Sequence, residues 1–205
     1  MRILLTGFGK FGYFEQNPTE IIVNGFKNRF PEVSVSGHVL EVNFNTVPLL
    51  YAQILQQIQP QFIVNLGLAA ETPVLQLEKV ALNTGFDAYS DKTHFALQPN
   101  APDAYFSSLP VEDIARYLCQ NGIPALRSNH AGHYLCNMLY YLSLQWCAQQ
   151  GNCQALFVHL PFTTQLAAQI CMQQHRAYPS LPQPVAEQAI ALIIDWYLKY
   201  VQQPA

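Results

Sequence analysis

The strongest constraint on the fold is an alternation of short apolar runs with segments of helical spacing. The apolar runs predict strands over residues 2–6, 33–40, 62–66, 75–82 and 154–158, with a short strand near 125–126. The spacing of apolar residues predicts helices over 17–30, 47–58, 111–119, 136–149 and 185–201, whereas 84–107 is predicted to be a long loop or a small hairpin. Strands that alternate with helices form sheets covered on both faces. The prediction is a single three-layer α/β/α domain over residues 1–205, with a mixed, largely parallel twisted sheet.

The carboxyl ends of parallel strands gather at one edge of a sheet, where ligands bind in folds of this class. Four features follow predicted strands: the loop over residues 7–12, Gly67, the turn over residues 128–133, and His159. We expect these four features to converge on one edge of the sheet.

Composition excludes several classes of function. The chain of 205 residues carries a formal net charge of −3 with only 11% charged residues, and it has no basic block that would bind nucleic acid. Its apolar runs fall short of the ~20 residues that span a membrane, and its N-terminus lacks a signal-peptide pattern. The five cysteines are an odd number without paired spacing, which predicts reduced thiols and a cytoplasmic protein. So low a charge density indicates either self-association or a surface rich in uncharged polar residues such as Gln, Asn and Ser.

Cys136 is the strongest candidate for chemistry. It follows the Gly-containing segment 128–133 and begins an apolar helix, where unpaired N–H groups and the helix dipole favour the thiolate. His159 ends a second apolar run and could serve as the base of this nucleophile. Taken singly, each side chain could equally be a core residue, and the other four cysteines are interpreted in that way. Their joint placement at the ends of buried elements makes a nucleophile and its base as good an interpretation as two core residues.

Two further features have both a structural and a functional interpretation. Glu78 interrupts an apolar strand, so it either faces solvent on an edge strand or orients an imidazole as the third member of a triad. The loop over residues 7–12 lacks the Gly-Lys-Ser/Thr ending of a P-loop and the dinucleotide fingerprint. Its rings, Phe8 and Phe11, therefore either line a small apolar pocket or pack into the core around a plain turn.

The spacing His130-x-x-His133-x-x-Cys136 could present three metal ligands. Gly132 interrupts a regular helix across this set, and no fourth ligand is evident. We therefore expect no metal, and we expect His133 to line the cleft.

Together the motifs resemble pyroglutamyl peptidase I, a family of cytosolic cysteine peptidases. The resemblance covers nearly the whole chain and rests on four blocks in the family's order: Leu4 to Gly12 with Asn17-Pro18, Glu78 to Asn83, Ser128 to Asn137, and Val158 to Phe162. Any one block is weak evidence, but the four together are highly specific.

The resemblance implies a Cys-His-Glu triad that removes N-terminal pyroglutamate from peptides without a metal or organic cofactor. Cys136 matches the nucleophile, His159 the base and Glu78 the orienting acid. The side chains that match the pocket for the pyrrolidone ring are Phe8, Phe11, Tyr134 and Leu135. The family also implies a homo-oligomer, either a tetramer or a dimer.

Three departures from the family pattern put turnover and substrate preference in question. The segment from Thr84 to Tyr89 lacks the family's arginine, His133 stands where threonine is common, and Lys10 replaces a common proline. An alternative function is therefore a catalytically weak relative that binds lactams or peptide N-termini without efficient turnover.

Overall fold

The structure is a computed structural model that describes residues 1–10, 17–26, 29–87 and 94–202. Its strands are β1 (Arg2–Phe8), β2 (Ser34–Leu40), β3 (Phe62–Leu68), β4 (Leu75–Glu78), β5 (Val80–Leu82), β6 (Ala104–Phe106), β7 (Ala125–Ser128), β8 (Gln154–Leu160), β9 (Phe162–Thr163) and β10 (Ser180–Leu181). Its helices are α1 (Pro18–Gly25), α2 (Val47–Ile58), α3 (Val111–Gln120), α4 (Leu135–Gln150), α5 (Thr164–Gln174) and α6 (Gln183–Tyr200).

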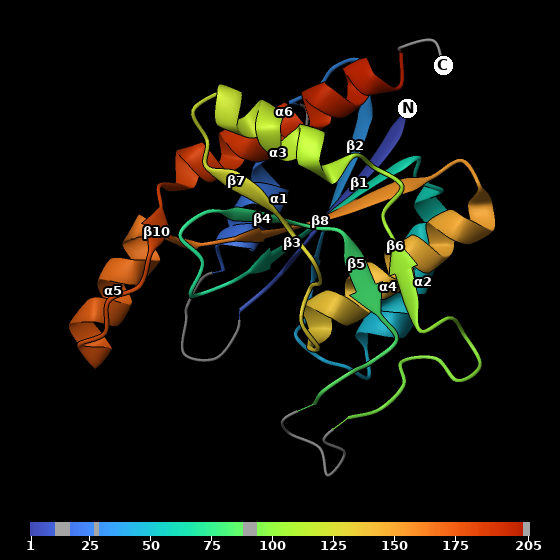
Figure 1. Cartoon of the computed structure of the whole chain (residues 1–205), viewed down its shortest axis with the longest axis horizontal. Helices are drawn as coiled ribbons and strands as arrows, with labels where there is room; N and C mark the ends of the chain where they lie inside the picture. Colours follow the sequence, from blue (N-terminus) through green and yellow to red (C-terminus); the bar gives the residue numbers. More distant parts are fainter. Residues whose placement is uncertain (11–16, 27–28, 88–93, 203–205) are drawn as a thin grey trace.

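Within the described residues, the main sheet has six strands in the order β2-β1-β3-β8-β4-β7. The first four strands run parallel to one another, β4 is antiparallel to β8, and β7 is parallel to β4. Two small sheets pair β5 with β6 and β9 with β10. The predicted mixed, largely parallel sheet is confirmed, and Figure 1 shows it between its covering helices.

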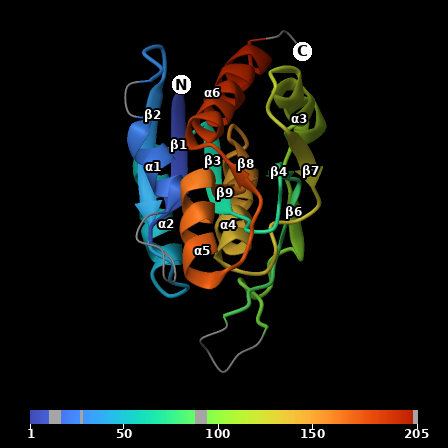
Figure 2. The same cartoon turned by 90° about the vertical axis from the view of Figure 1, so that its left-hand side faces the viewer.

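Alternating residues of the strands enter two separate apolar cores. Helices α1, α3 and α6 pack on one face, where Leu156 and Val158 of β8 lie. Helices α2 and α4 pack on the other face, where Ala155 and Phe157 lie. Figures 1 and 2 show these layers, with α5 beside β9 at one end of the sheet. None of the helices in the described ranges is both long and apolar enough to cross a membrane.

A buried polar network ties the central strands to the α2 and α4 layer. The Asn65 side chain donates to Thr6 Oγ1 at 2.7 Å and accepts from Ser143 Oγ at 2.8 Å. The Tyr51 hydroxyl lies 2.7 Å from Ser143 Oγ and 3.3 Å from Asn65 Nδ2. All four side chains are fully buried, so each depends on the others for its hydrogen bonds.

Several predicted elements differ from the observed ones. The helix predicted over 17–30 begins as expected, with Asn17 accepting from Thr19 N, but it ends at Gly25. The single strand predicted over 75–82 is two strands, because the chain leaves the main sheet at Lys79, whose ammonium binds the carbonyls of Ser107 and Leu109. Helix α5 is absent from the prediction because its apolar side is small and the rest of it is polar.

We expect Ser143→Ala to destabilise the fold by about 1–3 kcal/mol, because it leaves the buried Asn65 carbonyl without a donor. Chemical denaturation would measure this loss of unfolding free energy. The matched control is Ser34→Ala on the exposed start of β2, which should stay within about 0.5 kcal/mol of the parent chain. Equal stability of the two variants would contradict the role of the network.

Candidate active site

The strand register brings Glu78 to His159. Gln76 lies opposite His159 in the antiparallel β4–β8 pair, so Glu78 is the diagonal neighbour of His159 on the face that carries α4. The imidazole Nδ1 lies 2.7 Å from Glu78 Oε1. The glutamate is 1% exposed, and β4 lies between β8 and β7, so the solvent-facing edge-strand interpretation of Glu78 is wrong.

Cys136 occupies the first turn of α4, above the same face of the sheet. The helix begins at Leu135. Its N-cap residue, Tyr134, makes no capping hydrogen bond through its side chain. First-turn N–H groups have no partner within their own helix. Cys136 is partly exposed. Because it belongs to the first turn, it lies at the positive end of the helix, where these backbone donors are.

Gly67 makes room for this sulfur. It lies opposite His159 in the parallel β3–β8 pair, on the face toward α4. A Cβ atom at Gly67 would lie 2.9 Å from Cys136 Sγ and 2.8 Å from the Phe157 ring. The close approach of α4 to β3 thus requires a residue without a side chain at this position.

The imidazole of His159 interacts with both Cys136 and Glu78. Burial lowers the pKa of His159, but its hydrogen bonds and Coulomb interactions with Cys136 and Glu78 outweigh burial and raise the pKa to about 9. The ring is therefore an imidazolium at neutral pH, between Cys136 and the Glu78 carboxylate. Glu78 Oε2 has no hydrogen-bond partner among the described residues, so the imidazolium is the main partner of this buried carboxylate.

The expected convergence of four features at one sheet edge holds only in part. Gly67 and His159 lie side by side on parallel strands. The turn over 128–133, however, follows β7, which runs parallel to β4 and hence opposite to β8, with Ser128 level with Glu78. The start of α4, rather than the end of a parallel strand, brings Cys136 to the site.

Asn137 anchors the chain next to Cys136, although no pattern in the sequence singles it out. Its fully buried side chain accepts from Leu82 N at 2.9 Å and donates to the carbonyls of Leu82 and Thr84, both at 2.8 Å. It therefore fastens the end of β5 to the first turn of α4. Its position directly after the candidate nucleophile was the only signal in the sequence.

A small pocket opens beside Cys136. Phe8, Tyr134 and Leu135 line it as predicted, whereas Phe11 lies outside the described residues. The other lining residues are Asn17, Val42 and Leu68, which the sequence patterns did not indicate. The volume of about 90 Å³ is well below the ~300–1,000 Å³ of pockets for drug-sized ligands, so the pocket suits a small group.

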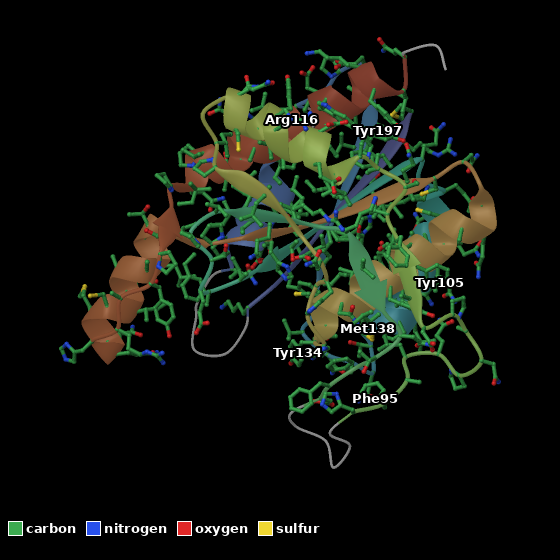
Figure 3. The ribbon with its side chains drawn as sticks, viewed as in Figure 1. Phe95, Tyr105, Arg116, Tyr134, Met138 and Tyr197 are labelled. Carbon is green, nitrogen blue, oxygen red and sulfur yellow. The ribbon has the colours of Figure 1, made fainter. Side chains whose placement is uncertain are left out.

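Aromatic contacts extend from this pocket to the loop after β5. Phe44 packs edge-on against Tyr134, with ring centroids 5.2 Å apart, and against Phe95 at 5.7 Å. Figure 3 shows Tyr134 and Phe95 at the same end of the molecule. Phe44 is a further residue that the sequence patterns did not indicate.

The histidines before Cys136 lie elsewhere. His130 and His133 are exposed and stack at 5.8 Å between centroids, and His94 packs edge-on against His133. His133 is not among the described lining residues of the pocket, contrary to expectation. In the described ranges no cluster of His, Cys, Asp or Glu is placed to hold a metal ion, so the spacing around Cys136 does not form the alternative ligand set.

The thiol, imidazole and carboxylate thus form the type of arrangement that cysteine hydrolases use to activate a nucleophile. A family model described as pyroglutamyl peptidase matches residues 1–200. The chain belongs to this family of cysteine peptidases.

Individual relatives agree with this assignment. The chain is 37% identical over 201 residues to the pyrrolidone-carboxylate peptidase of Halalkalibacterium halodurans, covering 94% of this chain and 97% of the relative. A mutant pyrrolidone carboxyl peptidase from Pyrococcus furiosus superposes with a TM-score of 0.92 at 31% identity, covering 98% of this chain and 100% of that one. The enzyme from Thermococcus litoralis gives 0.91 at 31% identity, covering 98% and 94%.

We expect Gly67→Ala to lower kcat/KM on the order of 10²-fold, because the added methyl group displaces the Cys136 sulfur. Gly25→Ala is the matched control, because a Cβ there meets nothing within 4 Å. Parental kinetics in folded Gly67→Ala would contradict the steric argument.

Proposed function

We propose that this chain is a cysteine exopeptidase that hydrolyses the amide bond after an N-terminal pyroglutamyl residue. The observation that carries the proposal is the contact of one buried imidazole with both the Cys136 thiol and the Glu78 carboxylate. The names of the relatives supply the substrate class, pyrrolidone-carboxylate peptides. The comparisons favour this activity over a binding-only relative.

The pocket chemistry supports recognition of a lactam. A pyroglutamyl residue has no free α-amine, because its α-nitrogen is the amide nitrogen of the lactam ring. The ring is therefore uncharged, and it is small. Phe8, Tyr134 and Leu135 offer it an apolar wall, whereas a charged N-terminus would lose its hydration there without a carboxylate partner in the described lining. Selection for pyroglutamate thus follows from the burial of a small neutral ring.

In the proposed reaction, the Cys136 thiolate attacks the pyroglutamyl carbonyl carbon. Backbone N–H groups in the first turn of α4 stabilise the oxyanion that forms. The His159 imidazolium donates its proton to the leaving amine, and a thioester links pyroglutamate to Cys136. Neutral His159 then takes a proton from water, which releases pyroglutamate, while Glu78 holds the ring orientation and stabilises its charge.

We also infer that residues 1–205 act as a single catalytic domain and that the protein self-associates as a tetramer or dimer. The low fraction of charged residues and the exposed apolar side chains of Leu49, Phe106 and Met172 support self-association. The oligomer size stays a prediction from the family resemblance.

We expect Cys136→Ser to lose more than about 10³-fold in kcat on a fluorogenic pyroglutamyl amide, because the hydroxyl is a far weaker nucleophile at neutral pH. Cys119→Ser and Cys171→Ser remove exposed thiols and should retain parental activity. Absence of thiol-dependent cleavage by the parent chain, or full activity of Cys136→Ser, would overturn the proposal.

The raised pKa of His159 predicts an alkaline limb near pH 9 in the pH profile of kcat/KM, where the imidazolium loses the proton it donates. Glu78→Gln removes one of the two partners that raise this pKa, so the limb should move to lower pH. The maximum rate should also fall roughly 10²–10⁴-fold as orientation is lost.

The control for this profile is Glu32→Gln, which makes the same charge change at an exposed position. It should leave both the limb and the rate unchanged. An alkaline limb that stays in place in Glu78→Gln would show that Glu78 does not act on His159.

A further inference from the structure

Two buried cysteines lie in contact at the end of α4 opposite to Cys136. The Cys147 sulfur lies 2.9 Å from the Cys153 sulfur, and the two side chains are 9% and 6% exposed. Cys147 lies eleven positions after Cys136 along the helix, which is about 16 Å along the axis. The pair is therefore outside the proposed active site, and the peptidase reaction does not use it.

We propose that Cys147 and Cys153 form a peroxide-sensitive dithiol that closes into a reversible intramolecular disulfide. A pair of small core residues would need only apolar packing around each side chain. These two sulfurs instead face one another, and a shift of about 0.9 Å brings them to the ~2.05 Å of a disulfide bond.

The chain between the cysteines gives a peroxide a short route to them. Residues 148–152 are all exposed; the first three end α4, and Gly151 and Asn152 follow it. Gly151 adopts a left-handed conformation with φ of 74°, and its N–H caps the helix at the Cys147 carbonyl. The two buried cysteines thus flank an exposed segment, and a molecule as small as hydrogen peroxide could reach them through a local opening of that segment.

The hydrogen bond between the sulfurs sets the order of the steps. The Cys147 thiol donates to the Cys153 sulfur, and this contact together with burial raises the pKa of Cys147. Cys147 therefore keeps its proton. Cys153 is assigned as the attacking cysteine and Cys147 as the resolving one.

In the first step, the Cys153 thiolate attacks one peroxide oxygen and the O–O bond breaks, which leaves a sulfenic acid and a hydroxide. The hydroxide takes up the proton released by the Cys153 thiol and leaves as water. In the second step, the Cys147 sulfur attacks the sulfenic sulfur, and the hydroxyl group departs with the Cys147 proton as a second water. The two sulfurs together lose two electrons, and the peroxide gains them.

The test is to expose the folded protein to hydrogen peroxide and then to unfold it in denaturant that contains an alkylating agent. The chymotryptic peptide from Cys147 to Leu156 is then analysed by mass spectrometry. This peptide contains only these two cysteines. We expect it to carry no alkyl group and to be lighter than the reduced peptide by two hydrogen atoms, with both thiols restored by dithiothreitol. The oxidised protein should also show a Tm higher on the order of 5 °C, because the bond closes a loop in the unfolded chain.

Matched variants separate the two roles. Cys147→Ala should leave Cys153 as a sulfenic acid that dimedone labels, whereas Cys153→Ala should give no sulfenic acid at Cys147. Circular dichroism confirms that each variant is folded. Two alkylated thiols in the peptide under conditions that oxidise the exposed Cys119 and Cys171 would overturn the proposal, as would oxidation of Cys153 to sulfinic acid without a link to Cys147.

Discussion

The hydrogen bond between His159 and Glu78 is the interaction on which the rest of the site depends. A carboxylate that is almost fully buried is costly unless a positive group compensates it. The antiparallel pairing of β4 with β8 supplies that compensation, because it makes Glu78 the diagonal neighbour of His159 on one face of the sheet. A parallel β4 would have reversed the order of its side chains along β8. The single reversal of direction in an otherwise parallel region thus creates the charged pair.

Helix α4 connects this pair to the core. Its first turn carries Cys136 over Gly67, and Asn137 ties the same turn to β5. About two turns later, Ser143 joins the buried network with Asn65 and Tyr51. The helix is held by polar contacts at two levels on its sheet-facing side, so its rotation and height above β3 are defined. That definition is what a sulfur needs to meet an imidazole on the neighbouring strand.

The alternation of elements and the four sequence blocks were sufficient to predict the layers of the fold and the meeting of Cys136, His159 and Glu78. The spacing of apolar residues along the chain could not predict which strands run antiparallel. It also could not place Glu78, because the local sequence is the same for an edge strand and for a strand inside the sheet. The break at Lys79 depends on carbonyls of Ser107 and Leu109, far away along the chain. Phe44 and Val42 reach the pocket area only through the tertiary fold, so no local motif marks them.

The segment after β5 departs from the family pattern, yet its first part is held firmly. Asn137 binds the Thr84 carbonyl, Phe86 N donates to the His133 carbonyl, and Gly85 pairs with Phe95. A Cβ at Gly85 would lie 2.6 Å from the Phe95 ring, so a side chain there would displace that ring. The Phe95 ring therefore fills the space beside Gly85 where a side chain would lie. Phe95 in turn packs against Phe44, and Phe44 packs against Tyr134 in the pocket wall. The altered segment thus acts on the pocket wall, whereas the His159–Glu78 pair rests on β4 and β8 and does not depend on it.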